Sequence, residues 1–88
     1  MLQRLPHTGL LPDSLPTAVL TCGDPARAAQ IAGYLDAAVC LGQQREYHTY
    51  QGTFRGTPLA VCSHGIGAPG AAIAFEELIA AGARRLLR

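Results

Sequence analysis

Residues 17–35 read TAVLTCGDPARAAQIAGYL, and this stretch decides the fold class. An apolar run of strand length stops at Gly23, as expected of a short buried strand. Asp24 followed by Pro25 is typical of a helix N-cap and first helical residue, and apolar residues then recur at helical spacing as far as Leu35. A strand that passes through a glycine into a helix predicts an α/β domain.

The rest of the chain extends this pattern. Residues 39–41, 46–54 and 58–63 are predicted strands, with a hairpin turn at Arg55-Gly56. A strongly apolar helix follows a glycine-rich loop and ends near Gly82, and residues 84–88 resemble a further strand. The order predicts an α/β fold, a partial α/β/α sandwich with a mixed, partly parallel sheet. Residues 1–16 hold three prolines and are predicted to form an extended arm.

The composition excludes several classes of protein. A net charge of +1 argues against a nucleic-acid binder or a membrane-surface binder. No run approaches the roughly 18 apolar residues that a spanning helix needs. The three cysteines show no metal-ligand spacing and are predicted to be buried free thiols in a reducing, cytoplasmic environment. All seven basic residues are arginine, which suits bidentate binding of phosphate or carboxylate.

Two glycine segments are candidate anion sites. At Gly23 the backbone can approach a ligand at a helix N-terminus, and Arg27 in the first turn could reach the same anion, although a solvated arginine is the alternative. Gly65, Gly67 and Gly70 satisfy G-x-G-x-x-G, so a dinucleotide (NADP)-binding fragment is a second hypothesis. That motif needs an acidic residue at the end of the next strand, and arginines stand there instead.

Several motifs are shared with one enzyme family. They are His7-Thr8-Gly9, Gly23-Asp24-Pro25-Ala26-Arg27, Arg45-Glu46-Tyr47, residues 62–69 (CSHGIGAP), Glu76-Glu77-Leu78 and Leu86-Leu87-Arg88. In order and spacing the chain resembles the hexameric uridine and purine nucleoside phosphorylases over nearly its whole length. The Arg-Glu-Tyr segment is more similar to the uridine branch. On pattern alone, that segment is typical of a solvated strand edge.

The resemblance implies specific roles. Gly23, Arg27 and Arg88 would bind phosphate, with Arg45 reaching in from a neighbouring subunit, and His7 would cross to the neighbour and contact the ribose 5′-hydroxyl. Glu46 and the Ile66 carbonyl would be ligands of a structural monovalent cation, potassium, and no other cofactor is implied. Gly70 stands where the uridine branch usually has serine. His64 stands where that branch commonly has threonine and the purine branch histidine.

The implied reaction is phosphorolysis of a nucleoside, uridine in the first instance, to free base and ribose 1-phosphate. The implied assembly is a homo-oligomer, a hexamer of dimers. Residues 1–88 would be the amino-terminal part of a single nucleoside phosphorylase domain whose carboxy-terminal, base-binding part is absent, so we expect the isolated chain to be inactive. The residues that catalyse the reaction are not identified. A third hypothesis is a non-catalytic anion-binding or oligomerisation module.

Overall fold

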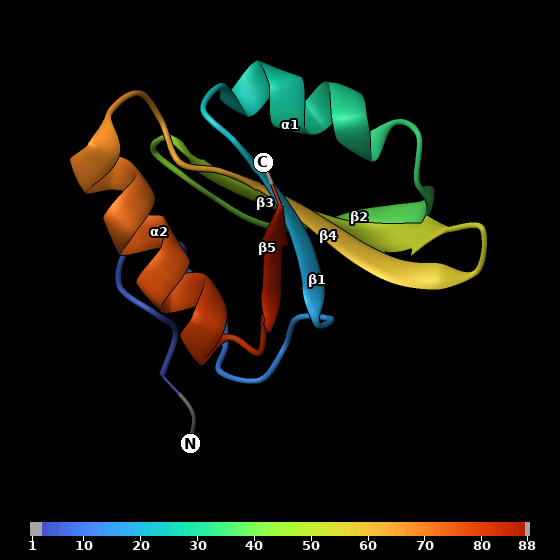
Figure 1. Cartoon of the computed structure of the whole chain (residues 1–88), viewed down its shortest axis with the longest axis horizontal. Coiled ribbons are helices and arrows are strands. Elements are labelled where there is room, and N and C mark those ends of the chain that lie inside the picture. Colours follow the sequence, from blue (N-terminus) through green and yellow to red (C-terminus); the bar gives the residue numbers. More distant parts are fainter. Residues whose placement is uncertain (1–2, 88) are drawn as a thin grey trace.

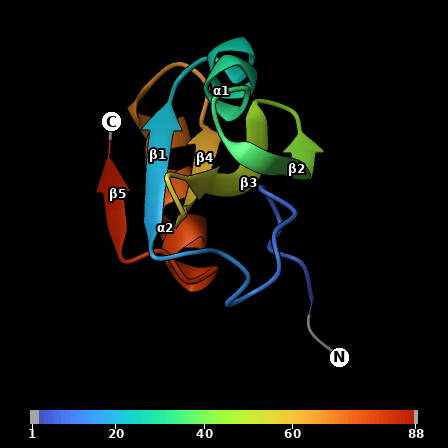
Figure 2. The same ribbon diagram turned by 90° about the vertical axis from the view of Figure 1, so that its right-hand side faces the viewer.

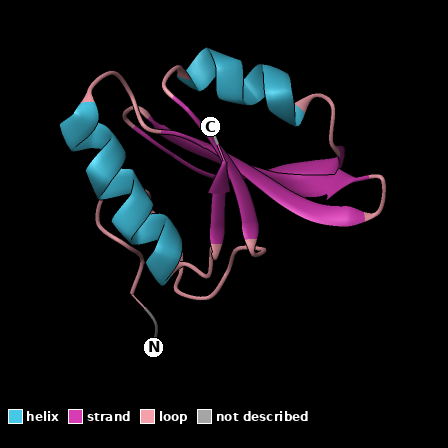
Figure 3. Cartoon of the chain, viewed as in Figure 1, coloured by secondary structure: helices cyan, strands magenta, loops and turns pink. Residues whose placement is uncertain are grey.

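The computed structural model describes residues 3–87, and its elements follow the predicted order. They are β1 (Ala18–Cys22), α1 (Pro25–Ala32), β2 (Asp36–Gln44), β3 (Tyr47–Phe54), β4 (Thr57–Ser63), α2 (Ala68–Ala80) and β5 (Arg85–Leu87) (Figures 1 and 3). Among these residues no helix is long and apolar enough to span a membrane.

The five strands form one mixed sheet in the order β2-β3-β4-β1-β5, with β5 and β2 at opposite edges (Figure 2). β1 is parallel to both of its neighbours, β4 and β5. β2, β3 and β4 are joined in antiparallel pairs. The prediction of a mixed, partly parallel sheet is therefore confirmed.

Side chains alternate between two apolar layers on either side of this sheet. Val19 and Ala60 pack toward α2 and the arm, in a core that includes Leu10 and Leu78. Val61 packs on the other side. On that side it packs against Ala28 and Ala32, two buried residues of α1. Because successive strand residues face opposite sides, β1 and β4 each serve both layers, and the α/β/α arrangement is confirmed (Figure 1).

The helix predicted to reach Leu35 is shorter, and the strand predicted at 39–41 is longer. α1 ends at Ala32, and tighter i to i−3 hydrogen bonds carry the turn on to Leu35, which is buried. β2 then begins at Asp36. It is an irregular edge strand whose residues are mostly exposed, with two register shifts, so it lacks the alternation that would have revealed its length.

The arm contains turns but no helix or strand between residues 3 and 16, and it does more than cover a surface. Leu10 is only 1 % exposed and belongs to the core beside α2. The Leu15 N–H donates to the Ala81 carbonyl at 2.8 Å, which ties the arm to the end of α2. The arm is therefore an integral part of one layer.

The prediction of three buried thiols is wrong for one cysteine. Cys62 is buried, and burial raises its pKa to about 11. Cys22 is half-buried, whereas Cys40 is exposed because it lies on the edge strand β2.

The packing of α2 against the sheet leads to a prediction about stability. Leu78 is fully buried and Ile79, the next residue of α2, is 54 % exposed. We expect Leu78→Ala to lower the free energy of unfolding by about 2–5 kcal/mol, because a core leucine leaves a cavity. Ile79→Ala, the matched control, should cost less than about 1 kcal/mol. Urea unfolding followed by circular dichroism measures both, and equal losses would mean that α2 packs through another face.

Candidate functional site

The loops that follow β1 and β4 meet at one edge of the sheet. The parallel ladder continues beyond the strands, because the His64 N–H donates to the Cys22 carbonyl at 2.9 Å and the Gly65 N–H to the Gly23 carbonyl at 2.8 Å. In α/β sheets, ligands bind at the carboxyl ends of parallel strands. The two glycine-containing segments singled out from the sequence therefore lie side by side at the carboxyl ends of β1 and β4.

The backbone conformation at Gly65 favours glycine, and Gly23 leaves little room for a side chain. Gly65 has a φ of +77°, and a Cβ there would lie 2.7 Å from Cγ of Glu46. A Cβ on Gly23 would lie 3.2 Å from the Gly65 carbonyl oxygen. A side chain at position 65 would therefore have to displace Glu46, whereas one at position 23 would require the Gly65 carbonyl to shift by a few tenths of an ångström.

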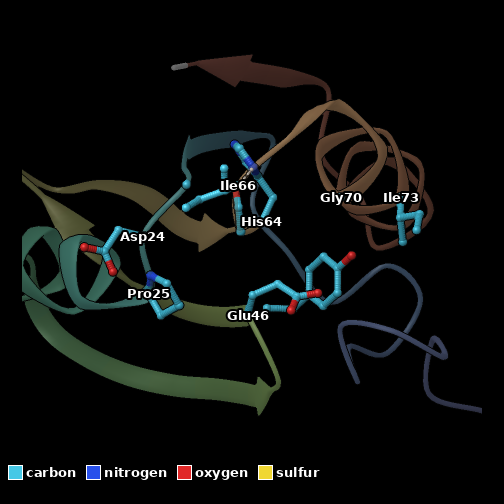
Figure 4. Close-up of a pocket in the computed structure, with 10 residues that line it drawn as sticks. Asp24, Pro25, Glu46, His64, Ile66, Gly70 and Ile73 are labelled. Atoms are coloured by element: carbon cyan, nitrogen blue, oxygen red, sulfur yellow. Dashed lines mark hydrogen bonds between the residues drawn. The ribbon is translucent and has the colours of Figure 1, made fainter.

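A pocket of about 670 Å³ opens at this junction, and we call it the main pocket. Its walls come from the start of α1, the start of β3, the glycine-rich loop and the first turns of α2. Asp24 and Pro25 lie on one side and Ile73 on the other (Figure 4). The remaining lining residues are Gly23, Glu46, Tyr47, His64, Gly65, Ile66 and Gly70.

A second pocket of about 520 Å³ adjoins the first, and we call it the arm pocket. It brings His7 of the arm together with Arg45, which occupies the tight turn between β2 and β3 at a φ of +52°. Both side chains are exposed. The pockets share Glu46, Tyr47 and Ile73, so they lie side by side.

The predicted phosphate ligands are not all in the main pocket. Gly23 lines it, whereas Arg27 is exposed on the first turn of α1 and lines a separate groove. Arg27 still lies near enough to the loop to act on the Cys22 thiol. Burial and the charge of Asp24 raise the pKa of this thiol, and the charge of Arg27 partly opposes them. Arg88 lies outside the described residues.

The predicted cation ligands lie in adjacent positions. Glu46 is half-buried and its side chain lies against Gly65, next to Ile66, whose carbonyl is the other predicted ligand. Burial, and then the nearby Glu46 carboxylate, raise the pKa of the buried Tyr47 phenol. Within residues 3–87 no three His, Cys, Asp or Glu side chains gather in a way that could hold a metal ion.

Position 70 has no room for a side chain. A Cβ on Gly70 would lie 2.6 Å from the carbonyl oxygen of His64, so α2 begins closer to that carbonyl than any other residue would allow. His64 itself is buried, and its Nδ1 donates to the Gly65 carbonyl at 2.9 Å. Its ring packs edge-on against Phe75 at 5.9 Å.

Glu77 is a site-proximal residue to which sequence reasoning assigned no role. It is buried on α2, and its carboxylate accepts hydrogen bonds from His7 and Thr8 of the arm. Its position was readable from the helix pattern, since it falls three residues after Ala74 and four before Ala81, on the buried stripe. A carboxylate on such a stripe requires partners.

Comparisons with known proteins define the family. Residues 17–88 match the family described as the Phosphorylase superfamily, and the chain belongs to it. Uridine phosphorylase of Treponema pallidum (strain Nichols) is 44 % identical over 82 residues, which cover 93 % of this chain and 32 % of that protein. The chain thus spans about a third of the length of the curated relatives it matches.

Solved structures agree with this family. Uridine phosphorylase of Vibrio fischeri ES114 superposes with a TM-score of 0.92 at 36 % identity, covering 96 % of this chain and 35 % of that one. Purine nucleoside phosphorylase of Toxoplasma gondii, in complex with immucillin-H, gives 0.91 at 35 % identity, covering 98 % and 35 %. Both carry the same arrangement of helices and sheet.

The crowding at position 70 yields a prediction. In an open helix, Gly→Ala raises stability by up to about 1 kcal/mol. We expect Gly70→Ala to lower the free energy of unfolding instead, by about 1 kcal/mol or more, because the methyl group meets the His64 carbonyl. Ala72→Gly on the exposed side of α2 calibrates helix propensity in the same urea experiment. A gain in stability from Gly70→Ala would show that the start of α2 moves freely.

Proposed function

We propose that this chain carries the phosphate-binding part of a nucleoside phosphorylase that uses uridine. The observation that supports this most directly is the junction of the Gly23 and Gly65 loops at the amino end of α1, in a chain whose relatives include uridine phosphorylases. Phosphate would attack C1′ of the ribose while the base leaves, which yields ribose 1-phosphate. The transition state carries positive charge on the sugar, so positioning the phosphate dianion is the main task of this part.

The phosphate would lie over Gly23. The amino end of α1 offers the partial positive charge of a helix terminus, and Arg27 in its first turn supplies a guanidinium that can swing from the surface toward the loop. Arg88 would supply the second guanidinium from the same subunit. Arginine suits this task, because its planar fork can donate two hydrogen bonds to one phosphate.

A neighbouring subunit would complete the site. His7 and Arg45, the two residues assigned to the neighbour's site, lie together in the arm pocket and are exposed there. Their shared location supports the idea that one surface delivers both to the adjacent subunit of a homo-oligomer. Arg45 would contact the phosphate and His7 the ribose 5′-hydroxyl.

A monovalent cation, potassium, is part of this proposal. The Glu46 carboxylate and the Ile66 carbonyl would hold it, and when bound it would balance the Glu46 charge between subunits. Hard oxygen donors of this kind suit such an ion. Gly70 contributes no hydroxyl and has no space for one, so these two donors would need matching donors from a second subunit.

The dinucleotide hypothesis is not favoured. Glu46 lies against Gly65, where the motif needs open space and an absence of negative charge for a pyrophosphate. β4 is an interior strand reached through an antiparallel hairpin, rather than the first strand of a parallel unit. In equilibrium dialysis, retention of NADP but not phosphate by the chain would restore it, and retention of neither would favour an oligomerisation module.

The phosphate role of Arg27 is testable in a hybrid enzyme, in which residues 1–88 are joined to the remaining two thirds of the Treponema pallidum relative. We expect Arg27→Ala to raise the KM for phosphate about tenfold or more, the equivalent of one charge-assisted hydrogen bond, with little change in the KM for uridine. Arg84→Ala is the control, because Arg84 bonds to the backbone at the end of α2. Equal increases in both KM values would move the phosphate elsewhere.

The role of Arg45 in the neighbour's site is testable by mixing subunits. Hybrid enzymes carrying Arg27→Ala or Arg45→Ala have every site damaged when assembled alone. If the site draws Arg27 from one subunit and Arg45 from the next, refolding the two together restores one site in each mixed dimer. Random assortment then returns roughly a quarter of the wild-type activity. Mixed oligomers proved by mass spectrometry but lacking any recovery would place Arg45 in its own subunit's site.

A further inference from the structure

The Glu77 carboxylate is the point at which the arm is fixed to α2. Oε1 accepts from the Thr8 N–H and from the Thr8 hydroxyl, each at 2.8 Å. Oε2 accepts from the His7 N–H at 3.1 Å and from Nδ1 of the His7 ring at 2.7 Å. Thr8 and Glu77 are both buried, so the bonds between them are shielded from water, whereas the bonds to His7 are only partly buried.

An ionised carboxylate satisfies every one of these partners. Two backbone N–H groups can only donate, and an ionised carboxylate can only accept. Burial opposes ionisation, but the hydrogen bonds from Thr8 and His7 outweigh it and lower the pKa of Glu77. A glutamine would turn one N–H₂ group toward a donor, whichever way its amide faced.

The same carboxylate fixes the protonation of the His7 ring. Because Nδ1 faces an acceptor at 2.7 Å, it carries the proton whenever the imidazole is neutral. The ring of Tyr47 lies edge-on to the His7 ring, with 6.2 Å between the ring centroids. The His7 side chain is 50 % exposed and lines the arm pocket, where the second nitrogen, Nε2, is left with a lone pair.

We propose that Glu77 is a positioning residue that docks the arm and holds neutral His7 as the Nδ1–H tautomer, so that Nε2 accepts a hydrogen bond from a sugar hydroxyl. The last step rests on the proposed function, in which His7 contacts the ribose 5′-hydroxyl. The site then distinguishes a hydroxyl that donates from a group of similar size that can only accept.

The tautomer is measured directly in the 88-residue chain by ¹⁵N correlation spectra of the His7 ring, above the pH at which it is protonated. We expect the Nδ1–H form in the wild type. In Glu77→Gln the amide N–H₂ can donate to Nδ1, so the Nε2–H form should become the major one, and the amide protons of His7 and Thr8 should exchange faster with solvent. Glu76→Gln removes the same charge from the exposed neighbouring residue and should change neither.

Two results would overturn the positioning role. One is an Nε2–H ring in the wild type, which needs no variant and so does not depend on whether Glu77→Gln folds. The other is a tautomer ratio in Glu77→Gln equal to that in Glu76→Gln.

The consequence for specificity is measured in the hybrid enzyme with uridine and 5′-deoxy-5′-fluorouridine, whose fluorine cannot donate. We expect wild-type kcat/KM to favour uridine by about fivefold or more, the scale of one neutral hydrogen bond, and Glu77→Gln to reduce that preference while Glu76→Gln retains it. A tautomer that switches without any change in preference would refute the ribose contact of His7, and that part of the proposed function, but would leave the docking by Glu77 standing.

Discussion

The parallel pairing of β1 with β4 is the interaction on which the rest of the structure depends. Two further hydrogen bonds, from the His64 N–H to the Cys22 carbonyl and from the Gly65 N–H to the Gly23 carbonyl, continue this pairing into the loops. Each loop leads into a helix, and the two helices cover opposite faces of the sheet. One ladder therefore sets the floor of the main pocket, the start of α1 and the start of α2, and Gly23 lies close to the Gly65 carbonyl where the two loops meet.

The arm depends on α2 in turn. Leu10 fills the core beside Leu78, while Glu77, one residue earlier on the helix, binds the backbone and side chains of His7 and Thr8. Apolar burial supplies most of the favourable free energy, and the carboxylate fixes where the chain must lie. As Ile73 of α2 lines both pockets, the helix that forms the wall of the main pocket also places the arm.

The features that could be predicted from the sequence are those with local causes. Arg55-Gly56 forms the predicted hairpin turn with φ values of +51° and +82°, and Gly82 takes the left-handed conformation that ends α2. β2 and the arm have no such signature, because an exposed edge strand lacks alternation and proline-rich chain lacks periodicity. Glu77 meets residues about 70 positions away in the chain, and only the folded sheet brings them together.

Because of the charges around the main pocket, a phosphate site here would need positively charged side chains from outside the pocket. Its lining contains two carboxylates, Asp24 and Glu46, and no arginine among the described residues. The Asp24 carboxylate is committed to the Ala26 N–H as the N-cap, and Glu46 would repel a dianion unless a bound cation balanced its charge. Repulsion of that kind is offset only by opposite charge at short range. The proposed sources are Arg27, which would have to swing inward, and Arg45, which lines the adjoining pocket. The described lining thus lacks the positive charge that a phosphate needs, which is why the proposed site requires guanidinium groups from outside the main pocket.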